Sequence, residues 1–135
     1  MEREEAGAAG RPLLVVDGAN VVGSVPDGWW RDRRGAAERL RDALVAVAEH
    51  GIPELPGPLD VLLVVEGAAR GVAALPEVRV VEASGSGDDR IVEAVHDALA
   101  EHPHRTCLVA TADRELRTRV TALGATVTGP RSVRP

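Results

Sequence analysis

The chain has 135 residues, of which 44% are hydrophobic, and carries a formal net charge of −5 from 21 acidic and 16 basic residues. All of the basic residues are arginine, which excludes a P-loop lysine and any lysine nucleophile or Schiff base. The single cysteine, Cys107, lies in an apolar run and excludes internal disulfides and zinc sites built from cysteine clusters.

The two ends of the chain differ from its middle in composition. The opening segment, "MEREEAGAAG", is acidic rather than an arginine-led targeting signal, and no apolar run approaches the roughly 18 residues of a membrane span. We therefore expect a cytoplasmic protein with a disordered leader over residues 1–11 and one domain over residues 12–135. The closing residues, "SVRP", are expected to be loose as well.

Three strands and one helix are predicted in the first part of the chain. The apolar run at residues 13–17 indicates a buried strand, and residues 31–51 follow as a helix. The apolar residues at helical spacing in that segment are Ala37, Leu40, Leu44, Val47 and Ala48. A breaker-rich loop at residues 52–58 precedes a continuous apolar run at residues 60–67, which is typical of a central strand buried on both faces. Residues 78–83 form the third predicted strand.

The second part of the chain alternates helix and strand in the same way. Residues 85–102 predict the clearest helix, whose apolar face consists of Ile91, Val92, Val95, Ala98 and Leu99. Residues 106–112 predict a fourth strand, residues 113–124 a helix with Leu116, Val120 and Leu123 inward, and residues 125–130 a short closing strand. This alternation predicts an α/β fold: a single Rossmann-like three-layer sandwich with a mainly parallel central sheet of four to five strands.

Acidic residues stand at the points where the predicted strands end. They are Asp17, Glu66 and Asp113 after the first, second and fourth strands, and Asp88 and Asp89 at the start of the helix before the fourth strand. Open parallel sheets bind ligands beyond the carboxyl ends of their strands, so we expect these carboxylates to meet at one edge. Like charges repel and burial makes each costlier, so a hard divalent cation, Mg²⁺ or Mn²⁺, is expected to neutralise them.

Helix capping is the alternative explanation for several of these acids. Asp88 or Asp89 fits an N-cap, and Asp113 fits the same place in its own helix, because Asp is favoured there and complements the helix dipole. Asp17 is harder to explain in this way, since it precedes a glycine turn with no obvious helix to cap. The combination of Asp17 with the later acids therefore favours a site.

Three motifs occur in order along the chain: "VVDGANVV", "SGSGDDRIVEAV" and "VATADRELRTRVTALGATVTGPRSV". With them, the chain resembles the NYN (YacP-like) branch of the PIN-like metal-dependent ribonucleases over residues 13–133. The D-G-x-N turn after an apolar strand is moderately specific, and its combination with the acidic pair and the later T-x-D is strong.

The resemblance implies a PIN-like domain that uses Mg²⁺ or Mn²⁺ to hydrolyse RNA phosphodiester bonds as an endoribonuclease. It implies metal ligands at Asp17, Asp88, Asp89 and Asp113. Asn20 is implied to orient the site through hydrogen bonds, and Thr111 to bind a metal-bound water or a phosphate oxygen. Glu66 occupies a strand-end place where such proteins often carry an acid, and we expect it to be peripheral.

RNA binding has to overcome the net negative charge, because nonspecific affinity for nucleic acid comes mainly from basic residues that neutralise phosphates. The arginines do gather in three groups: Arg31, Arg33 and Arg34; Arg114, Arg117 and Arg119; and Arg131 and Arg134. We consider Arg31, Arg33, Arg34 and Arg114 as RNA contacts, and a solvated surface as the alternative for each group. Trp29 and Trp30 either stack on an unpaired base or pack their loop onto the following helix.

Two other functions remain open from the sequence. One is a catalytically weak RNA-binding or partner-binding module with a PIN-like fold, and the other is a phosphohydrolase acting on nucleotides or small phosphate esters. A haloacid-dehalogenase-type phosphatase fits worse, because the second residue after Asp17 is Ala19 rather than an acid. The expected partner is single-stranded or structured RNA, with a homodimer or a protein partner also open.

Overall fold

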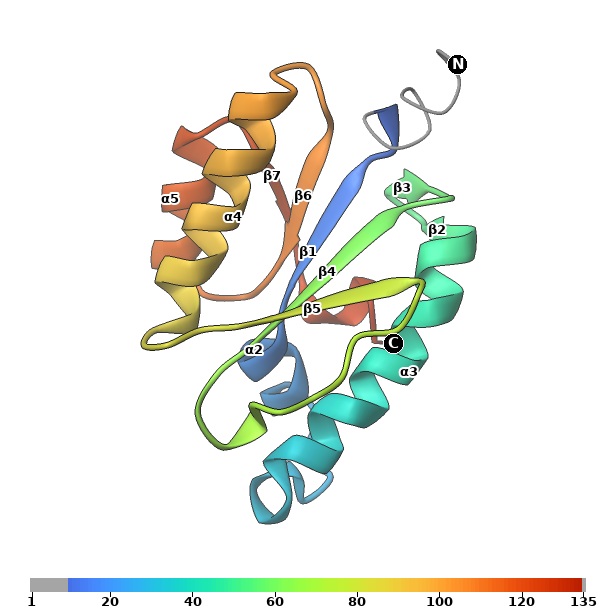
Figure 1. Ribbon diagram of the computed structural model, residues 1–135, viewed down its shortest axis with the longest axis vertical. Coiled ribbons are helices and arrows are strands. Elements are labelled where there is room, and N and C mark those ends of the chain that lie inside the picture. Colours follow the sequence, from blue (N-terminus) through green and yellow to red (C-terminus); the bar gives the residue numbers. More distant parts are fainter. Residues whose placement is uncertain (1–9, 135) are drawn as a thin grey trace.

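The computed structural model describes residues 10–134, and Figure 1 shows a central sheet between two layers of helices. The five strands of the sheet are β1 (Leu13–Asp17), β4 (Asp60–Val65), β5 (Val78–Glu82), β6 (Cys107–Ala110) and β7 (Thr126–Thr128). Their order is β5-β4-β1-β6-β7, and every neighbouring pair is parallel. The predicted α/β sandwich is confirmed, with a sheet that is wholly parallel.

The helices lie on both faces of the sheet, with α3 on one side and α4 and α5 on the other (Figure 1). The α-helices are α2 (Gly18–Gly23), α3 (Arg33–His50), α4 (Gly87–Glu101) and α5 (Arg114–Ala122). Short 3-10 helices are η1 (Trp29–Arg31), η2 (Gly67–Ala69) and η3 (Pro130–Ser132). Part of the predicted loop at 52–58 is strand, because β2 (Gly51–Ile52) and β3 (Leu55–Pro56) pair as a small antiparallel ladder.

The apolar runs of the sequence are explained by this layering. Successive residues of a strand face opposite sides, so Leu14 and Val16 pack into the layer of α3, whereas Leu13 and Val15 pack against α4 and α5. Burying a side chain of this kind stabilises the fold by about 1.5–3 kcal/mol relative to leaving it exposed. Cys107 is buried in the second layer, and burial raises the pKa of its thiol to about 11.

Two expectations about the end of the chain were wrong. Leu123, predicted to face inward, lies just beyond α5 and is 36% exposed. The segment "SVRP" is not loose up to residue 134, because Val133 is buried and Arg134 pairs with Asp27 at 2.7 Å.

Of the predicted leader, residues 1–9 lie outside the described part of the chain, as does residue 135. Among residues 10–134, no helix is long and apolar enough to cross a membrane.

Candidate active site

The strand order reverses between β1 and β6. The chain places β4 and then β5 on one side of β1, and afterwards β6 and β7 on the other side. In open parallel sheets, the crevice beyond the carboxyl ends of the strands at such a reversal is where ligands bind. Asp17 is the last residue of β1, and Thr111 follows directly after β6. Both residues therefore lie at the position that the topology favours for a site.

Asp17 is held by hydrogen bonds to both of its carboxylate oxygens. Oδ1 accepts from the backbone N–H of Asn20 at 3.3 Å, and Oδ2 accepts from the hydroxyl of Thr111 at 2.8 Å. The first bond caps α2, so the expectation that Asp17 has no helix to cap was wrong. The second bond joins the end of β1 to the end of β6. Asp17 is only 7% exposed, and these two bonds fix its orientation.

Gly18 is required by a close approach of the first residue of α2 to strand β4 rather than by an unusual backbone angle. A Cβ atom at this position would lie 2.5 Å from the carbonyl oxygen of Val64 in β4. The absence of a side chain lets α2 begin directly at the end of β1, which brings Asn20 back toward the sheet. The Oδ1 atom of Asn20 then accepts from the backbone N–H of Ala112 at 2.9 Å, across the strand reversal.

Thr111 and Asp113 form the other side of the site. Thr111 is completely buried, and its hydroxyl oxygen accepts from the backbone N–H of Asp113 at 3.1 Å while donating to Asp17. The hydroxyl of Thr111 thus contacts Asp17 and the backbone of Asp113, and Thr111 does not line the cleft that is described below. Asp113 caps α5, as the alternative explanation predicted, by accepting from the N–H of Leu116 at 2.9 Å.

The start of α4 brings the carboxylate of Asp88 to this edge of the sheet. The N-cap of α4 is Ser86, whose hydroxyl accepts from the N–H groups of Asp88 and Asp89. Neither acid is therefore the N-cap, as the alternative had it, although both stand in the first turn, where a carboxylate complements the helix dipole. Glu66 at the end of β4 accepts from the N–H of Gly87 and holds the beginning of α4 beside the sheet. A Cβ at position 87 would collide with this carboxylate.

These elements enclose one open polar cleft of about 620 Å³. It is lined by the carboxylates of Asp17, Glu66, Asp88 and Asp113 together with Ala19, Asn20, Gly85 and Ser86. Asp89 does not line it, because its side chain is largely exposed and pairs with Arg119 at 3.0 Å. Glu66, which the sequence indicated as peripheral, is part of the cleft. Its place at the end of a continuous apolar run is the signal that identifies it.

The cleft raises the pKa of two of its acids. Burial is the main cause for Asp17, and the bonds from Thr111 and Asn20 oppose it, while Asp88 and Glu66 raise it further. Burial is also the main cause for Asp88, followed by the charges of Asp113 and Glu66. The unfavourable interaction among these carboxylates is the electrostatic condition that a bound cation relieves.

The donor atoms suit a hard cation that keeps part of its water shell. All four cleft acids offer oxygen, the ligand type that Mg²⁺ and Mn²⁺ prefer, and Mg²⁺ commonly uses only one or two carboxylates plus waters. Within residues 10–134, no three His, Cys, Asp or Glu groups lie close enough to form a ready-made protein cage. The residues therefore fit a partly hydrated ion rather than a fully enclosed one.

Comparisons with known proteins agree with this topology. No protein-family model matches the chain, and no curated protein matches it in sequence. The solved structures that match it over 90% of its length include Rae1 (YacP) from Bacillus subtilis, with 21% identity, a TM-score of 0.65 and 70% of that chain covered. They also include the W164L mutant of the same protein, with 18% identity, a TM-score of 0.68 and 72% of that chain covered. The chain has the PIN-like fold of YacP. The YacP-like resemblance predicted from the three motifs is thereby confirmed at the level of the fold.

In this PIN-like fold, the two tryptophans stand beside the site on η1. Trp29 is half-buried and packs against the core, as the packing alternative predicted, whereas Trp30 is 53% exposed. Their rings meet edge to face with centroids 5.9 Å apart. The guanidinium of Arg33 lies over the ring of Trp29 at 5.3 Å, and that of Arg31 over Trp30 at 6.0 Å.

The remaining arginines divide into exposed and structurally engaged side chains. Arg34 makes only an exposed pair with Glu38 at 3.6 Å, and Arg114 is an exposed first residue of α5. By contrast, Arg117 donates to the carbonyl of Thr111 at 2.8 Å. Arg119 and Arg134 are engaged in the pairs with Asp89 and Asp27.

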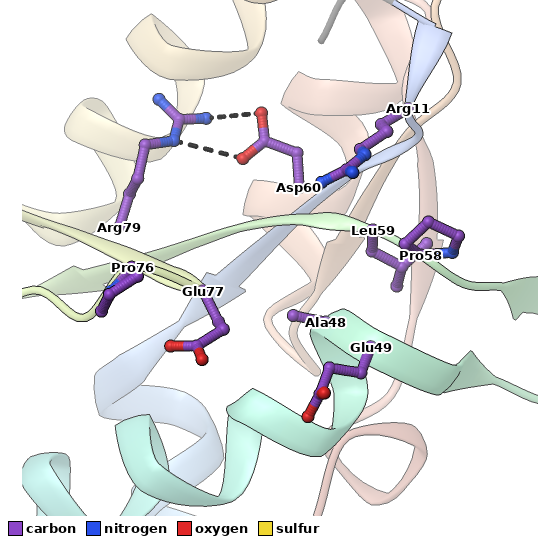
Figure 2. Close-up of a pocket in the computed structure, with 9 residues that line it drawn as sticks. All are labelled: Arg11, Ala48, Glu49, Pro58, Leu59, Asp60, Pro76, Glu77 and Arg79. Carbon is purple, nitrogen blue, oxygen red and sulfur yellow. Dashed lines mark hydrogen bonds and ion pairs between the residues drawn. The ribbon is translucent and has the colours of Figure 1, made fainter. Parts of the chain in front are cut away.

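A second hollow, of about 560 Å³, lies at the opposite edge of the sheet, near the beginning of β4 (Figure 2). Its most prominent charges are already paired: Asp60 binds Arg79 in a two-bond arrangement at 3.0 and 3.2 Å and also accepts from Arg105 at 2.7 Å. Because it lies at the amino ends of the strands and its carboxylate Asp60 is already paired with two arginines, this hollow is a weaker candidate than the acidic cleft.

Proposed function

We propose that this chain is an endoribonuclease that depends on Mg²⁺ or Mn²⁺ and hydrolyses RNA phosphodiester bonds in the acidic cleft. The observation that carries the proposal is the convergence of Asp17, Glu66, Asp88 and Asp113 in one open cleft at the strand reversal. Its PIN-like fold and its three motifs support the same activity, because the family that the chain resembles acts on RNA with carboxylate-bound metal.

Asp17, Asp88 and Asp113 are the carboxylates that would surround the cation, one or two of them as direct ligands and the others through its bound waters. When bound, a divalent ion lowers the pKa of a water ligand and stabilises negative charge on phosphate oxygens. Glu66 stands beside these three and fixes α4 through the N–H of Gly87. Asp89, which the resemblance implies as a fourth ligand, instead balances Arg119 at the rim of the site in our proposal.

The chain's own residues also supply positioning and charge. Thr111 and Asn20 keep the carboxylate of Asp17 in one orientation through bonds to its two oxygens. The carboxylate of Asp88 lines the cleft beside Asp113 and Glu66, whose charges raise its pKa, and a bound cation would relieve this repulsion. Arg114 directly follows Asp113 of the cleft, and Arg33 lies over the ring of Trp29; these two arginines are the proposed phosphate contacts.

Cleavage of a labelled single-stranded RNA tests this proposal. Wild type should cut internal bonds in Mg²⁺ or Mn²⁺ and stop in chelator, and Asp17→Asn or Asp113→Asn should reduce the rate by about 100-fold or more. Asp97→Asn is the matched control, since this exposed acid lies on α4 outside the cleft. Equal rates for wild type and the Asp17 variant would refute the assignment of the site.

In the part of the chain that the structure describes, no closed protein cage for a metal is formed, and this favours one alternative, a module that binds RNA without cutting it. The same experiment separates the two functions when RNA binding is measured in parallel. An RNA that binds tightly but is never cut, with any divalent ion, would replace the nuclease by the binding module.

A further inference from the structure

A smaller hollow lies directly beside the acidic cleft and shares two lining residues with it, Ala19 and Glu66. Its volume is about 210 Å³. The floor is apolar and buried, and it is made by Val22 of α2, Ala37 of α3 and Val65 at the end of β4. The two hollows therefore form a continuous surface at the carboxyl edge of the sheet, acidic on one side of Ala19 and apolar on the other.

The wall of this hollow contains an aromatic ring and a guanidinium group. Trp29 lines it from η1, and Arg33, whose guanidinium lies over that ring at 5.3 Å, lines it from the first residue of α3. Glu66 supplies the polar edge, where it faces the cleft. Aromatic rings and arginine planes are the surfaces on which proteins stack unpaired bases.

We propose that this hollow binds one unpaired base of the RNA, next to the phosphate that lies in the acidic cleft. The ligand is a flat ring with an apolar face and a polar rim, which matches an apolar floor, an aromatic wall and a carboxylate edge. The positive charge of Arg33 lies beside the path of the adjoining phosphate. This inference rests on the proposed function, because it assigns the neighbouring nucleotide of the same substrate.

The two tryptophans consequently have different tasks. Trp29 is part of the hollow and contacts the base, whereas Trp30 is mostly exposed and does not line it. A nucleotide held in base pairs cannot enter a hollow of this kind without being unstacked. The protein should therefore require an unpaired nucleotide at one position beside the cut, and the requirement should depend on Trp29.

The test compares an intact single-stranded RNA with a set of RNAs that each lack one base near the cleavage site. Binding is measured in Mg²⁺ immediately after rapid mixing, before cleavage, by quenching of tryptophan fluorescence in a Trp30→Phe background, so that the signal comes from Trp29 and does not require cleavage. One abasic position should weaken binding by about 10-fold and abolish the quenching, the effect expected from the loss of one base stack.

The variants are compared by the fluorescence anisotropy of an end-labelled RNA, which needs no tryptophan in the protein. Trp29→Leu should weaken binding of the intact RNA by a similar factor and should be insensitive to the abasic position, whereas Trp30→Leu should behave as wild type. Ala69→Leu tests the hollow in a second way, since it keeps Trp29 but narrows the hollow from the side of η2. This variant, too, should weaken binding of the intact RNA. If no abasic position changes binding, or if Trp30→Leu has the larger effect, the base-binding role is wrong. Loss of cleavage with base-dependent binding retained would instead overturn only the proposed nuclease activity.

Discussion

The hydroxyl of Thr111 donates a 2.8 Å hydrogen bond to the carboxylate of Asp17 and so joins the ends of β6 and β1 where the strand order reverses. The two residues are 94 positions apart in the sequence, and both are buried. This contact fixes the deepest acid of the cleft from the opposite side of the reversal. It makes the orientation of Asp17 dependent on the packing of both halves of the sheet.

Replacing Thr111 by Val should test that dependence. The change keeps the shape but leaves Asp17 without its hydroxyl donor and the N–H of Asp113 without its acceptor. We expect a loss of about 1–3 kcal/mol in the free energy of unfolding, measured with urea. Thr118→Val is the control, because that exposed hydroxyl bonds only within α5. Equal effects of the two substitutions would contradict the importance of the Thr111 contact.

In chelator, the contribution of the cleft acids to the free energy of unfolding should fall as the pH rises from acid to neutral. Folding raises the pKa of Asp17 and Asp88 above 3.8, so the folded state binds protons at these groups more tightly than the unfolded chain. Their stabilising contribution is complete below pH 3.8 and is lost as the pH rises through the folded pKa values.

Asp88→Asn should remove part of this loss. The variant is expected to be more stable than wild type at neutral pH in chelator, and the difference should vanish in acid, as measured by urea unfolding at several pH values. Asp89→Asn is the matched control, since it removes only an exposed ion pair with Arg119. A gain for Asp88→Asn that does not vary with pH would point to a cause other than charge repulsion.

Metal binding should be visible in thermal stability without any activity assay. Mg²⁺ or Mn²⁺ at about 100 times its dissociation constant should stabilise the wild type by about 2.7 kcal/mol relative to chelator. Asp17→Asn should lose most of this shift, and Asp97→Asn should keep it. If neither ion raises the melting temperature of the wild type, the cleft does not hold a cation in the free protein.

Gly18→Ala should damage the fold at the beginning of α2. The added Cβ would lie 2.5 Å from the carbonyl oxygen of Val64, so the start of α2 and strand β4 would have to move apart at a cost of about 1–3 kcal/mol. Gly85→Ala is the control, because a Cβ there meets nothing within 4 Å and the change should stay within about 0.5 kcal/mol. Chemical denaturation of the two variants gives the comparison, and a neutral Gly18 variant would show that this edge of the sheet is not tightly packed.

Much of the fold could be predicted because its signals are local. The continuous apolar run of β4 and the helical spacing in α4 are read directly from neighbouring residues. The six residues of α2 are too few for a periodic signal, so the sequence indicated a turn there and missed the capping role of Asp17. Leu123 fits the helical spacing, but α5 ends at Ala122 and the leucine is left at the surface.

The sequence by itself determined the alternation of strands and helices, the presence of acids at strand ends, and the YacP-like resemblance, because each depends on residue type and order along the chain. Only the tertiary structure decided which acids meet. Asp88 and Asp89 are adjacent in sequence, yet a helix turns by about 100° per residue, so one faces the cleft and the other pairs with Arg119. The positions of Glu66 and Trp29 were likewise decided by the tertiary structure, because they depend on how β4, α3 and α4 pack against one another.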